Sequence, residues 1–342
     1  MPATSVARSS SFQTLLKKLV TVRQHELAAT VGVDIGSSGI KIVALGRRKG
    51  SGQRPVIGME RVPVSAKPDE SAASLRAAVE KLHLPTKTIA LSVSGPSVIM
   101  RVVEMPTLRP EDLKRALPFE AQRYLPFPVQ DVILDGELLG SVDPKKAWVL
   151  VVACKKDLIA QRLDLARRAG LEVSLIDVDA LAVANAFLEV GTAQRKTPTS
   201  AVINIGSQLT SVVIFKSTTP YLVRDIPWGA ERLVKELSQQ LGQDAAKVRQ
   251  LLETAQPDDA LRASLKEASE SLLVELQLSF DYFENQLGHP PEEVFLTGGL
   301  SACQPFVDGM RQQLTQNLVV WEPSPGVTGP FSVAFGLALR TA

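Results

Sequence analysis

A short internal repeat is the sequence feature that most constrains the fold. Residues 31–45 read VGVDIGSSGIKIVAL, and residues 201–215, 170 positions later, read AVINIGSQLTSVVIF. Each copy has a β-branched run, a turn with glycine and serine, and a second β-branched run, which is the pattern of a two-stranded hairpin. The corresponding positions are Ile35 and Ile205, Gly36 and Gly206, Ser37 and Ser207, Val43 and Val213, with Asp34 opposite Asn204. We therefore expect two related α/β halves that meet at a cleft, each offering one glycine-containing turn to a shared ligand.

The length agrees with more than one domain. At roughly 150 residues per domain, 342 residues predict two or three. Strand and helix patterns predict a basic, serine-rich tail at 1–29 and a first half made of 30–96 and 172–191. They also predict a small inserted α/β subdomain at 97–171, with a strand–helix–strand–strand order, and a second half at 192–342.

The expected elements follow from hydrophobic periodicity and turn residues. Beyond the two hairpins, strands are expected at 56–64, 89–93, 97–105, 132–139, 147–154, 171–176 and 294–296. Helices are expected at 70–82, 111–124, 157–169, 179–189, 231–241, within a charged stretch at 244–287, and at 331–340. Pro118 should bend the helix at 111–124 or end its first half.

Composition excludes several functional classes. The 38 basic and 36 acidic residues leave a net charge of +2, so no nucleic-acid partner is expected. Cys154 and Cys303 are too far apart in sequence for a CxxC metal site, and two cysteines are compatible with a reducing compartment. No apolar run approaches the roughly 18 residues of a membrane-spanning helix, which favours a cytoplasmic protein.

The turn of the first hairpin has the chemistry of a phosphate site. Gly36 and Gly39 allow close approach of a ligand to the backbone, and Ser37 and Ser38 add hydroxyl donors. Asp34 could hold Mg²⁺ through water, and Lys41 could neutralise phosphate charge. The alternative is a plain β-hairpin in which glycine and serine serve only the turn.

A third glycine turn lies in the second half. Residues 296–300, LTGGL, follow a strand and precede a helix, so Gly298, Gly299 and Leu300 could lie against a flat ring. The alternative is a tight strand-to-helix connection. Together the three glycine turns predict a nucleotide site.

The motifs DIGSSGIK, NIGS and LTGG resemble the phosphate-1, phosphate-2 and adenosine motifs of the actin-like ATPase superfamily. The segment ALPFEAQRYLPFP at 116–128 resembles, more specifically, the PilM family of type IV pilus assembly proteins, and the resemblance extends over residues 30–342. It implies an actin-like fold of two ribonuclease-H-like halves around a nucleotide cleft. It also implies that the last helix, 331–340, packs back near the first half.

The resemblance further implies a function. Members of the family are cytoplasmic, ATP-binding assembly factors that bind the N-terminal segment of the inner-membrane protein PilN and link it to the pilus motor. The protein would then lie at the inner face of the inner membrane, peripherally, and a homodimer is conceivable. ATP with weakly held Mg²⁺ is the expected cofactor. The implied nucleotide contacts in the second half are Asn204, Gly206, Ser207, Thr210, Glu231 and Lys235.

Three groups of residues have two interpretations each. Tyr124 and Phe127, in the proline-rich corner of the insertion, are either core or the wall of a groove for a partner peptide. Asp177 and Asp179 lie near the phosphates by resemblance, but capping of a helix by Asp179 is favoured over a catalytic role. Glu231 and Lys235 could form a surface pair instead of a nucleotide contact.

The sequence departs from its superfamily at Asn204, where aspartate is usual. An amide keeps the hydrogen bonds of the hairpin but cannot act as a base or supply negative charge beside a metal. We therefore expect ATP binding with slow or absent hydrolysis, unless Asp177, Asp179 or Glu231 substitutes.

Two rival functions remain. A small-molecule kinase of the superfamily would need a catalytic carboxylate and a substrate pocket, for which no motif is present. A filament-forming division protein like FtsA usually carries a C-terminal amphipathic tail, which is not expected after FGLALR. A basic amphipathic pattern at 12–20 could rest on an anionic membrane, although a disordered tail or a helix folded onto the body explains it as well.

Overall fold

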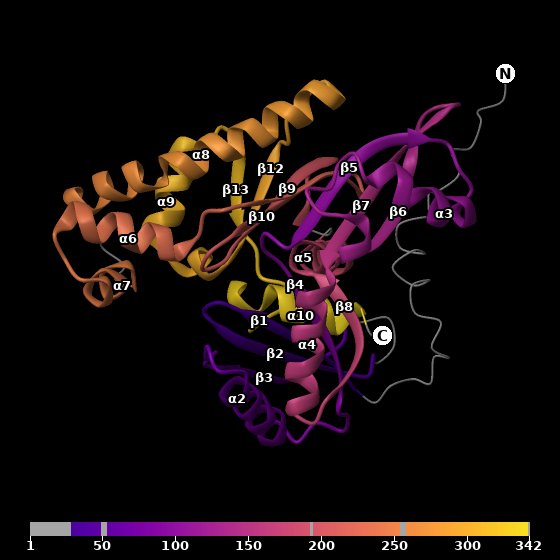
Figure 1. Ribbon diagram of the computed structural model, residues 1–342. Coiled ribbons are helices and arrows are strands. Elements are labelled where there is room, and N and C mark those ends of the chain that lie inside the picture. Colours follow the sequence, from indigo (N-terminus) through magenta and orange to yellow (C-terminus); the bar gives the residue numbers. More distant parts are fainter. Residues whose placement is uncertain (1–28, 49–52, 192–193, 254–257, 341–342) are drawn as a thin grey trace.

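The structure is a computed structural model that describes residues 29–48, 53–191, 194–253 and 258–340. Residues 1–28, almost all of the expected basic tail with its amphipathic pattern, lie outside the described part. Two five-stranded sheets and one three-stranded sheet make up the β-structure there. In Figure 1 the first half lies at the bottom, the second half at the upper left and the inserted subdomain at the upper right.

The first-half sheet has the order β3-β2-β1-β4-β8. Its strands are β1 (Ala29–Gly36), β2 (Gly39–Gly46), β3 (Val56–Val62), β4 (Thr88–Val93) and β8 (Glu172–Val178). Alternate residues face opposite sides, so Val31 and Val33 pack under helix α2 (Pro68–Lys81), whereas Val43 and Leu45 face the centre of the molecule.

The second-half sheet has the equivalent order β11-β10-β9-β12-β13. Its strands are β9 (Thr199–Ile205), β10 (Thr210–Lys216), β11 (Thr219–Ile226), β12 (Glu293–Gly298) and β13 (Asn317–Val320). In both sheets the first three strands are antiparallel and the last two run parallel to the first. The sequence repeat is therefore a repeat of topology.

Helices cover the outer face of the second sheet. They are α6 (Ala230–Leu241), α7 (Ala245–Glu253), α8 (Asp259–Leu287) and α9 (Gln304–Gln313). The charged stretch at 244–287 is thus divided into α7 and α8, and α8 crosses the top of Figure 1. The sequence patterns did not predict α9 or β13.

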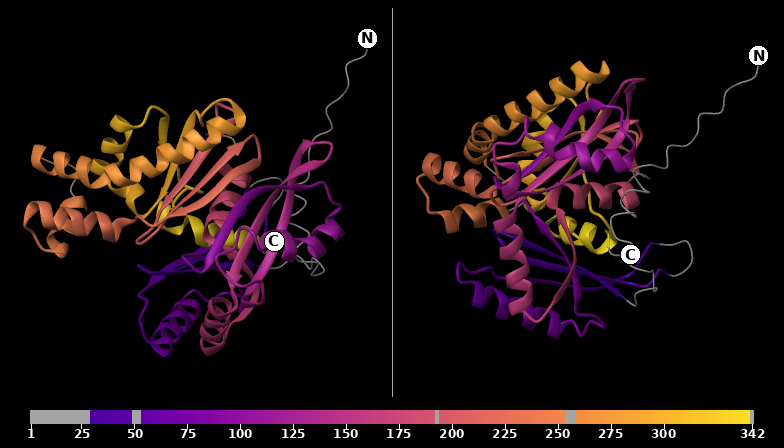
Figure 2. Two further views of the ribbon diagram at one scale, coloured as in Figure 1. Left: turned by 45° about the horizontal axis from the view of Figure 1, so that its top comes forward. Right: turned by 45° about the vertical axis from the view of Figure 1, so that its right-hand side comes forward.

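Two helices lie between the halves. Helix α5 (Asp179–Ala186) leads from the first half toward the second, and α10 (Ser332–Arg340) returns from the second half to the first. A Cβ atom on Gly336 would lie 1.9 Å from the carbonyl oxygen of Ala182, and one on Gly32 would lie 2.0 Å from that of Ala334. Only glycine allows these backbones to approach so closely. Both views of Figure 2 keep the yellow helix α10 between the two main sheets, in the position expected for the last helix.

The inserted subdomain contains a sheet of order β5-β7-β6 with one helix against it. Its elements are β5 (Val98–Pro106), α3 (Pro110–Ala121), β6 (Val132–Asp143) and β7 (Lys146–Lys155). Pro118 lies inside α3, and the helix continues past it to Ala121, so the expectation that Pro118 ends the first half of this helix is wrong.

Helix α4 (Lys156–Arg168) follows the insertion but packs with the first half. Leu165 and Ala166 belong to the same hydrophobic cluster as the β1 residues Val31 and Val33. We therefore assign the insertion to residues 98–155 and α4 to the first half. Among the helices of the described segments, none is long and apolar enough to cross a bilayer.

Candidate functional site

The first hairpin presents an open turn with a buried cation behind it. Gly36 pairs with Gly39, and Ser37 and Ser38 are exposed at the tip. Lys41 and Asp34 lie behind the turn, both buried, with Nζ 3.0 Å from Oδ2. A Cβ atom on Gly36 would lie 2.8 Å from Nζ of Lys41. The turn thus combines accessible backbone with a nearby positive charge, as an anion site requires.

The second hairpin is held by the N-terminus of α6. Glu231 accepts hydrogen bonds from Ser207 Oγ at 2.7 Å and from Gln208 Nε2 at 3.1 Å. The backbone N–H groups of Ala230 and Glu231 donate to the carbonyls of Gly206 and Ser207. Glu231 is therefore bonded to the turn itself and not to Lys235, which lies exposed one helical turn further on.

Thr210, expected to contact nucleotide, supports this hairpin from within. It is fully buried, and its hydroxyl donates to the carbonyl oxygen of Trp228 at 2.8 Å.

The third turn lies beside the second hairpin because β12 pairs with β9. Gly298 has a φ of +92°, and a Cβ atom there would lie 2.4 Å from the carbonyl oxygen of Ile205 and 2.7 Å from Asn204 Oδ1. A Cβ atom on Gly299 would meet nothing closer than 3.8 Å, so its backbone faces open space. The side chain of Leu300 is buried in the second-half core, which leaves its backbone as the part that could face a ligand.

Carboxylates from both halves lie close enough for their charges to interact. Burial raises the pKa of Asp179 to about 7, and the negative charge of Asp34 adds to this rise. Asp225 of β11 raises the pKa of Asp179 further, also through its charge. Asp225 accepts a hydrogen bond from Ser211 Oγ at 2.7 Å, and burial raises its own pKa. Asp225 could not be found from the sequence, because it is the penultimate residue of an ordinary strand with no motif around it.

Asp177 and Asp179 have different roles from those expected. Asp179 is the first residue of α5, whose N-cap is Val178, so the capping interpretation of Asp179 is wrong. The Ser92 and Ser94 hydroxyls act on its carboxylate and lower its pKa against the effect of burial. Asp177 points away, into a buried ion pair with Arg340.

The residues beside the first hairpin fit a magnesium ion held through water. The described residues contain no group of three His, Cys, Asp or Glu side chains that could bind a metal directly. An ion with its own water shell needs only acceptors, and Mg²⁺ retains several waters in many protein sites. Asp34 Oδ1 and the amide oxygen of Asn204 are such acceptors, one from each half, and only Asp34 is charged.

A cavity of about 1040 Å³ lies between the insertion and the second half. It is lined by β5, β11 and helix α8, and its aromatic residues are Tyr124, Trp148, Tyr221 and Tyr282. We call it the β5–β11 groove. Strand β5 pairs only with β7, and β11 only with β10, within the part of the chain that the structure describes, so each has one open edge.

Of the two aromatic residues expected at a partner site, only Tyr124 lines the groove. Phe127 lies elsewhere, with Lys155 Nζ 4.3 Å from the centre of its ring.

Comparison with known proteins matches this architecture to one family. The family model described as type IV pilus assembly protein PilM matches residues 32–341. Among solved structures, the chain is similar to one titled "PilM-PilN type IV pilus biogenesis complex", with a TM-score of 0.78, 23% identity, and coverage of 91% of this chain and 98% of that one.

More distant structures share the fold. The ethanolamine utilization protein EutJ from Carboxydothermus hydrogenoformans has a TM-score of 0.56 and 15% identity over 96% of each chain. The activator of 2-hydroxyisocaproyl-CoA dehydratase from Clostridium difficile, with bound ADPNP, has a TM-score of 0.50 and 11% identity over 91% of this chain and 93% of that one. These likenesses confirm the expected actin-like ATPase fold.

Proposed function

The chain belongs to the family of type IV pilus assembly proteins PilM, and from this premise we propose that it binds ATP in the cleft and a segment of PilN in the β5–β11 groove. The first part rests on the glycine turns, and the second on the groove. Each part can fail without the other.

ATP binding is supported by the two equivalent hairpins and the third glycine turn. In this proposal the backbones of Gly36, Ser37, Ser38 and Gly39 cradle one end of the phosphate chain, and Lys41 turns from Asp34 toward it. Gly206 and Ser207 cradle it from the other half, while Gly298 and Gly299 leave room for the adenine ring. The Clostridium difficile activator, which shares this fold, was solved with an ATP analogue bound.

Magnesium, when bound, would neutralise phosphate charge; the protein's own residues do the rest of the positioning. Asp34 and Asn204 would hold the ion's water shell from opposite halves. Because Asn204 is neutral and cannot accept a proton, the cleft lacks one of the two carboxylates that usually place the attacking water. Of the three carboxylates named from the sequence as substitutes, Glu231 is bonded to Ser207 and Gln208 and Asp177 is paired with Arg340, which leaves Asp179. We propose slow or absent hydrolysis, so that nucleotide acts by occupancy.

PilN binding is supported by one observation above the others: two open strand edges line a single cavity with aromatic walls. An extended peptide can pair its backbone with such an edge and bury alternate side chains. We propose that the N-terminal segment of PilN pairs with β5, with apolar side chains against Trp148, Tyr221 and Leu278. The solved relative with a TM-score of 0.78 carries PilN in its title. PilN would hold the protein at the inner membrane.

The groove and the cleft share residues, which gives nucleotide a way to affect the partner. Leu209, whose carbonyl accepts from Gly206 N–H, lines the groove, and so do Gly95 and Asp225. Closure of the halves on ATP would therefore move the end of the groove and change the affinity for PilN. Through this change the protein would link PilN to the pilus motor.

Isothermal titration with ATP and with a synthetic N-terminal PilN peptide, separately and in sequence, tests the proposal. Binding of both, with the affinity for one changed by the other, is expected. Rapid ADP release with a sugar or a short carboxylate would favour the kinase function instead.

A further inference from the structure

Arg162, which no sequence motif indicates, lies beside the first hairpin. It belongs to α4, and its Nη2 donates a hydrogen bond of 3.2 Å to the carbonyl oxygen of Ile35. Ile35 immediately precedes Gly36, so this bond fixes the end of β1 just where the phosphate turn begins.

The same guanidinium supplies positive charge to the carboxylates of the cleft. Its electrostatic partners are Asp179 and Asp34, whose charges oppose the lowering of its pKa by burial. Its Nε is buried and has no hydrogen-bond partner. Arginine stays charged even when buried, so two cations lie near these carboxylates: Lys41, paired with Asp34, and Arg162, whose charge acts on Asp34 and Asp179.

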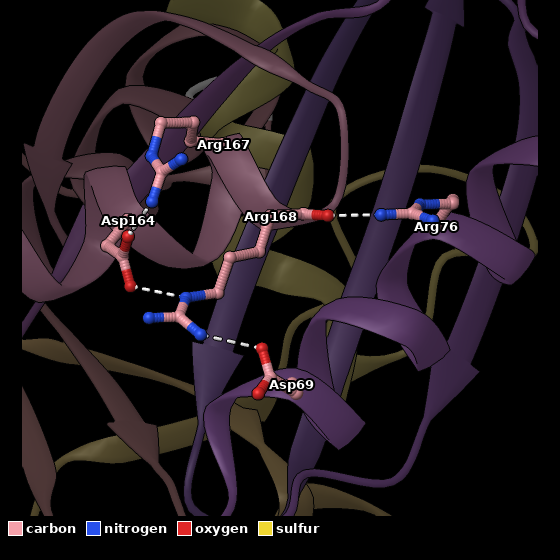
Figure 3. Close-up of polar contacts among 5 residues, drawn as sticks. All are labelled: Asp69, Arg76, Asp164, Arg167 and Arg168. Atoms are coloured by element: carbon pink, nitrogen blue, oxygen red, sulfur yellow. Dashed lines mark hydrogen bonds and ion pairs between the residues drawn. The ribbon is translucent and has the colours of Figure 1, made fainter.

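Helix α4 is held at its C-terminal end, as Figure 3 shows. Arg168 bonds to Asp164 and to Asp69 of α2, each at 2.6 Å. Arg76 of α2 donates to the carbonyl oxygens of Arg168 and Ala169, the last ones of the helix.

The other end of α4 is held by the insertion. Lys156 Nζ donates to the carbonyl oxygen of Gln130 at 2.7 Å, and the N–H of Lys155 donates to Ser97. A helix fixed at both ends holds Arg162 in place, so the guanidinium is bonded to the carbonyl oxygen of Ile35 and keeps its charge near Asp34 and Asp179.

We infer that Arg162 is a positioning residue of the nucleotide site: it fixes the start of the first phosphate turn and offsets the charge of Asp34 and Asp179, so that a nucleoside triphosphate binds without needing a divalent cation. The inference rests on the proposed ATP binding. In sites with two facing carboxylates, a metal ion neutralises the negative charge. Here Lys41 and Arg162 would do so instead.

The test compares wild type with Arg162→Met, Arg162→Lys and the matched control Arg76→Met, using fluorescent ATP with EDTA and then with Mg²⁺. Arg76 also donates to backbone carbonyls of α4 but has no part in the cleft, so its loss reports the effect of a loosened helix alone. Thermal unfolding and PilN-peptide affinity report that each variant is folded.

In EDTA, Arg162→Met should bind ATP roughly tenfold more weakly than wild type, because a charge-assisted hydrogen bond is lost and two carboxylates lose a counter-charge. Magnesium should restore much of that loss, Arg162→Lys should retain most of the affinity, and Arg76→Met should bind as wild type does. Equal binding by wild type and Arg162→Met in EDTA overturns the inference, and so does an equal loss in Arg76→Met. If wild type binds no ATP under any condition, the proposed function falls as well.

Discussion

Nε of Arg340 lies 3.0 Å from Oδ2 of Asp177, and each side chain is only 6% exposed. Arg340 ends α10, and Asp177 is the penultimate residue of β8, so a buried ion pair fastens the last helix to the first-half sheet. Burial raises the pKa of Asp177, and the arginine opposes that rise. The residue that offsets part of this burial penalty lies 163 positions away in sequence.

Removal of one partner should cost more than removal of both. Arg340→Met leaves an uncompensated carboxylate in the interior and should lower the free energy of unfolding by about 3–5 kcal/mol. Arg340→Met combined with Asp177→Asn should lose clearly less. Urea denaturation of the two variants measures the difference, and equal losses would show that the pair has no coupling.

Bulk at the two hairpins should abolish ATP binding while the fold is retained. A side chain at Gly36 meets the flexible end of Lys41, and one at Gly206 meets the Leu209 carbonyl at 3.0 Å, so the strands themselves can persist. Gly36→Val and Gly206→Val should each remove the rise in melting temperature that ATP produces. Gly309→Ala, in open space on α9, is the control. A two-hairpin site is wrong if both valine variants still respond to ATP.

The amide at Asn204 should limit hydrolysis more than binding. Asn204→Asp restores a carboxylate opposite Asp34 and should accelerate single-turnover hydrolysis, with stronger dependence on Mg²⁺ and little change in ATP affinity. Quenched-flow measurement on both proteins provides the comparison. Fast hydrolysis by wild type that the aspartate does not improve would point to Asp179 as the substitute.

Stability should fall as pH rises through the titration of Asp179. Its pKa is about 7 in the folded protein, against roughly 4 in an unfolded chain. Between these values the folded state binds more protons, so the contribution is complete below pH 4 and is lost as pH rises through 7. The side chain at this position in the variant Asp179→Asn cannot titrate. The free energy of unfolding of this variant, relative to wild type, should therefore increase as pH rises from 4 through 7, by about 2–4 kcal/mol at pH 8. Denaturation in EDTA at several pH values would contradict this if the difference stayed constant.

Substitutions should weaken PilN-peptide binding most where the replaced side chain lines the β5–β11 groove. Tyr124→Ala removes part of the wall and should lower affinity several-fold, about 1 kcal/mol. Phe127→Ala loses its contact with Lys155 and should act more weakly. Phe119, 78% exposed and outside the lining, is the control, and Phe119→Ala should bind as wild type does. Peptide affinity that is the same in all three variants would place PilN elsewhere.

The sequence alone predicted the parts of the fold that local patterns encode. The hairpins, the insertion and the final helix follow from periodicity and turn residues, and the described residues contain them, whereas the strand order within each sheet was not predicted. Helix α9 and strand β13 went unnoticed because PFVDGM and NLVV are short and weakly patterned, and are defined mainly by packing on β12.

In the candidate site, too, only residues in local motifs could be predicted. The glycines and polar residues of the hairpins belong to such motifs, whereas Arg162 and Asp225 come close to the hairpins only through tertiary packing. Asp177 was grouped with Asp179 because both flank the strand-to-helix junction, but Asp177 still lies in β8 whereas Asp179 begins α5, and the two side chains have different partners. The resemblance implied a nucleotide contact at Thr210, yet its hydroxyl donates to the carbonyl oxygen of Trp228 inside the protein.

The two open strand edges that line the β5–β11 groove also restrict which partners could enter it. A folded domain carries its own neighbouring strands and could not bring one strand into the groove, whereas a chain terminus or an unstructured loop could. The groove should therefore accept one peptide per protein molecule and reject sheet-to-sheet association. Any self-association of this protein would then have to use a different face, which would leave the groove open to the proposed peptide at high protein concentration.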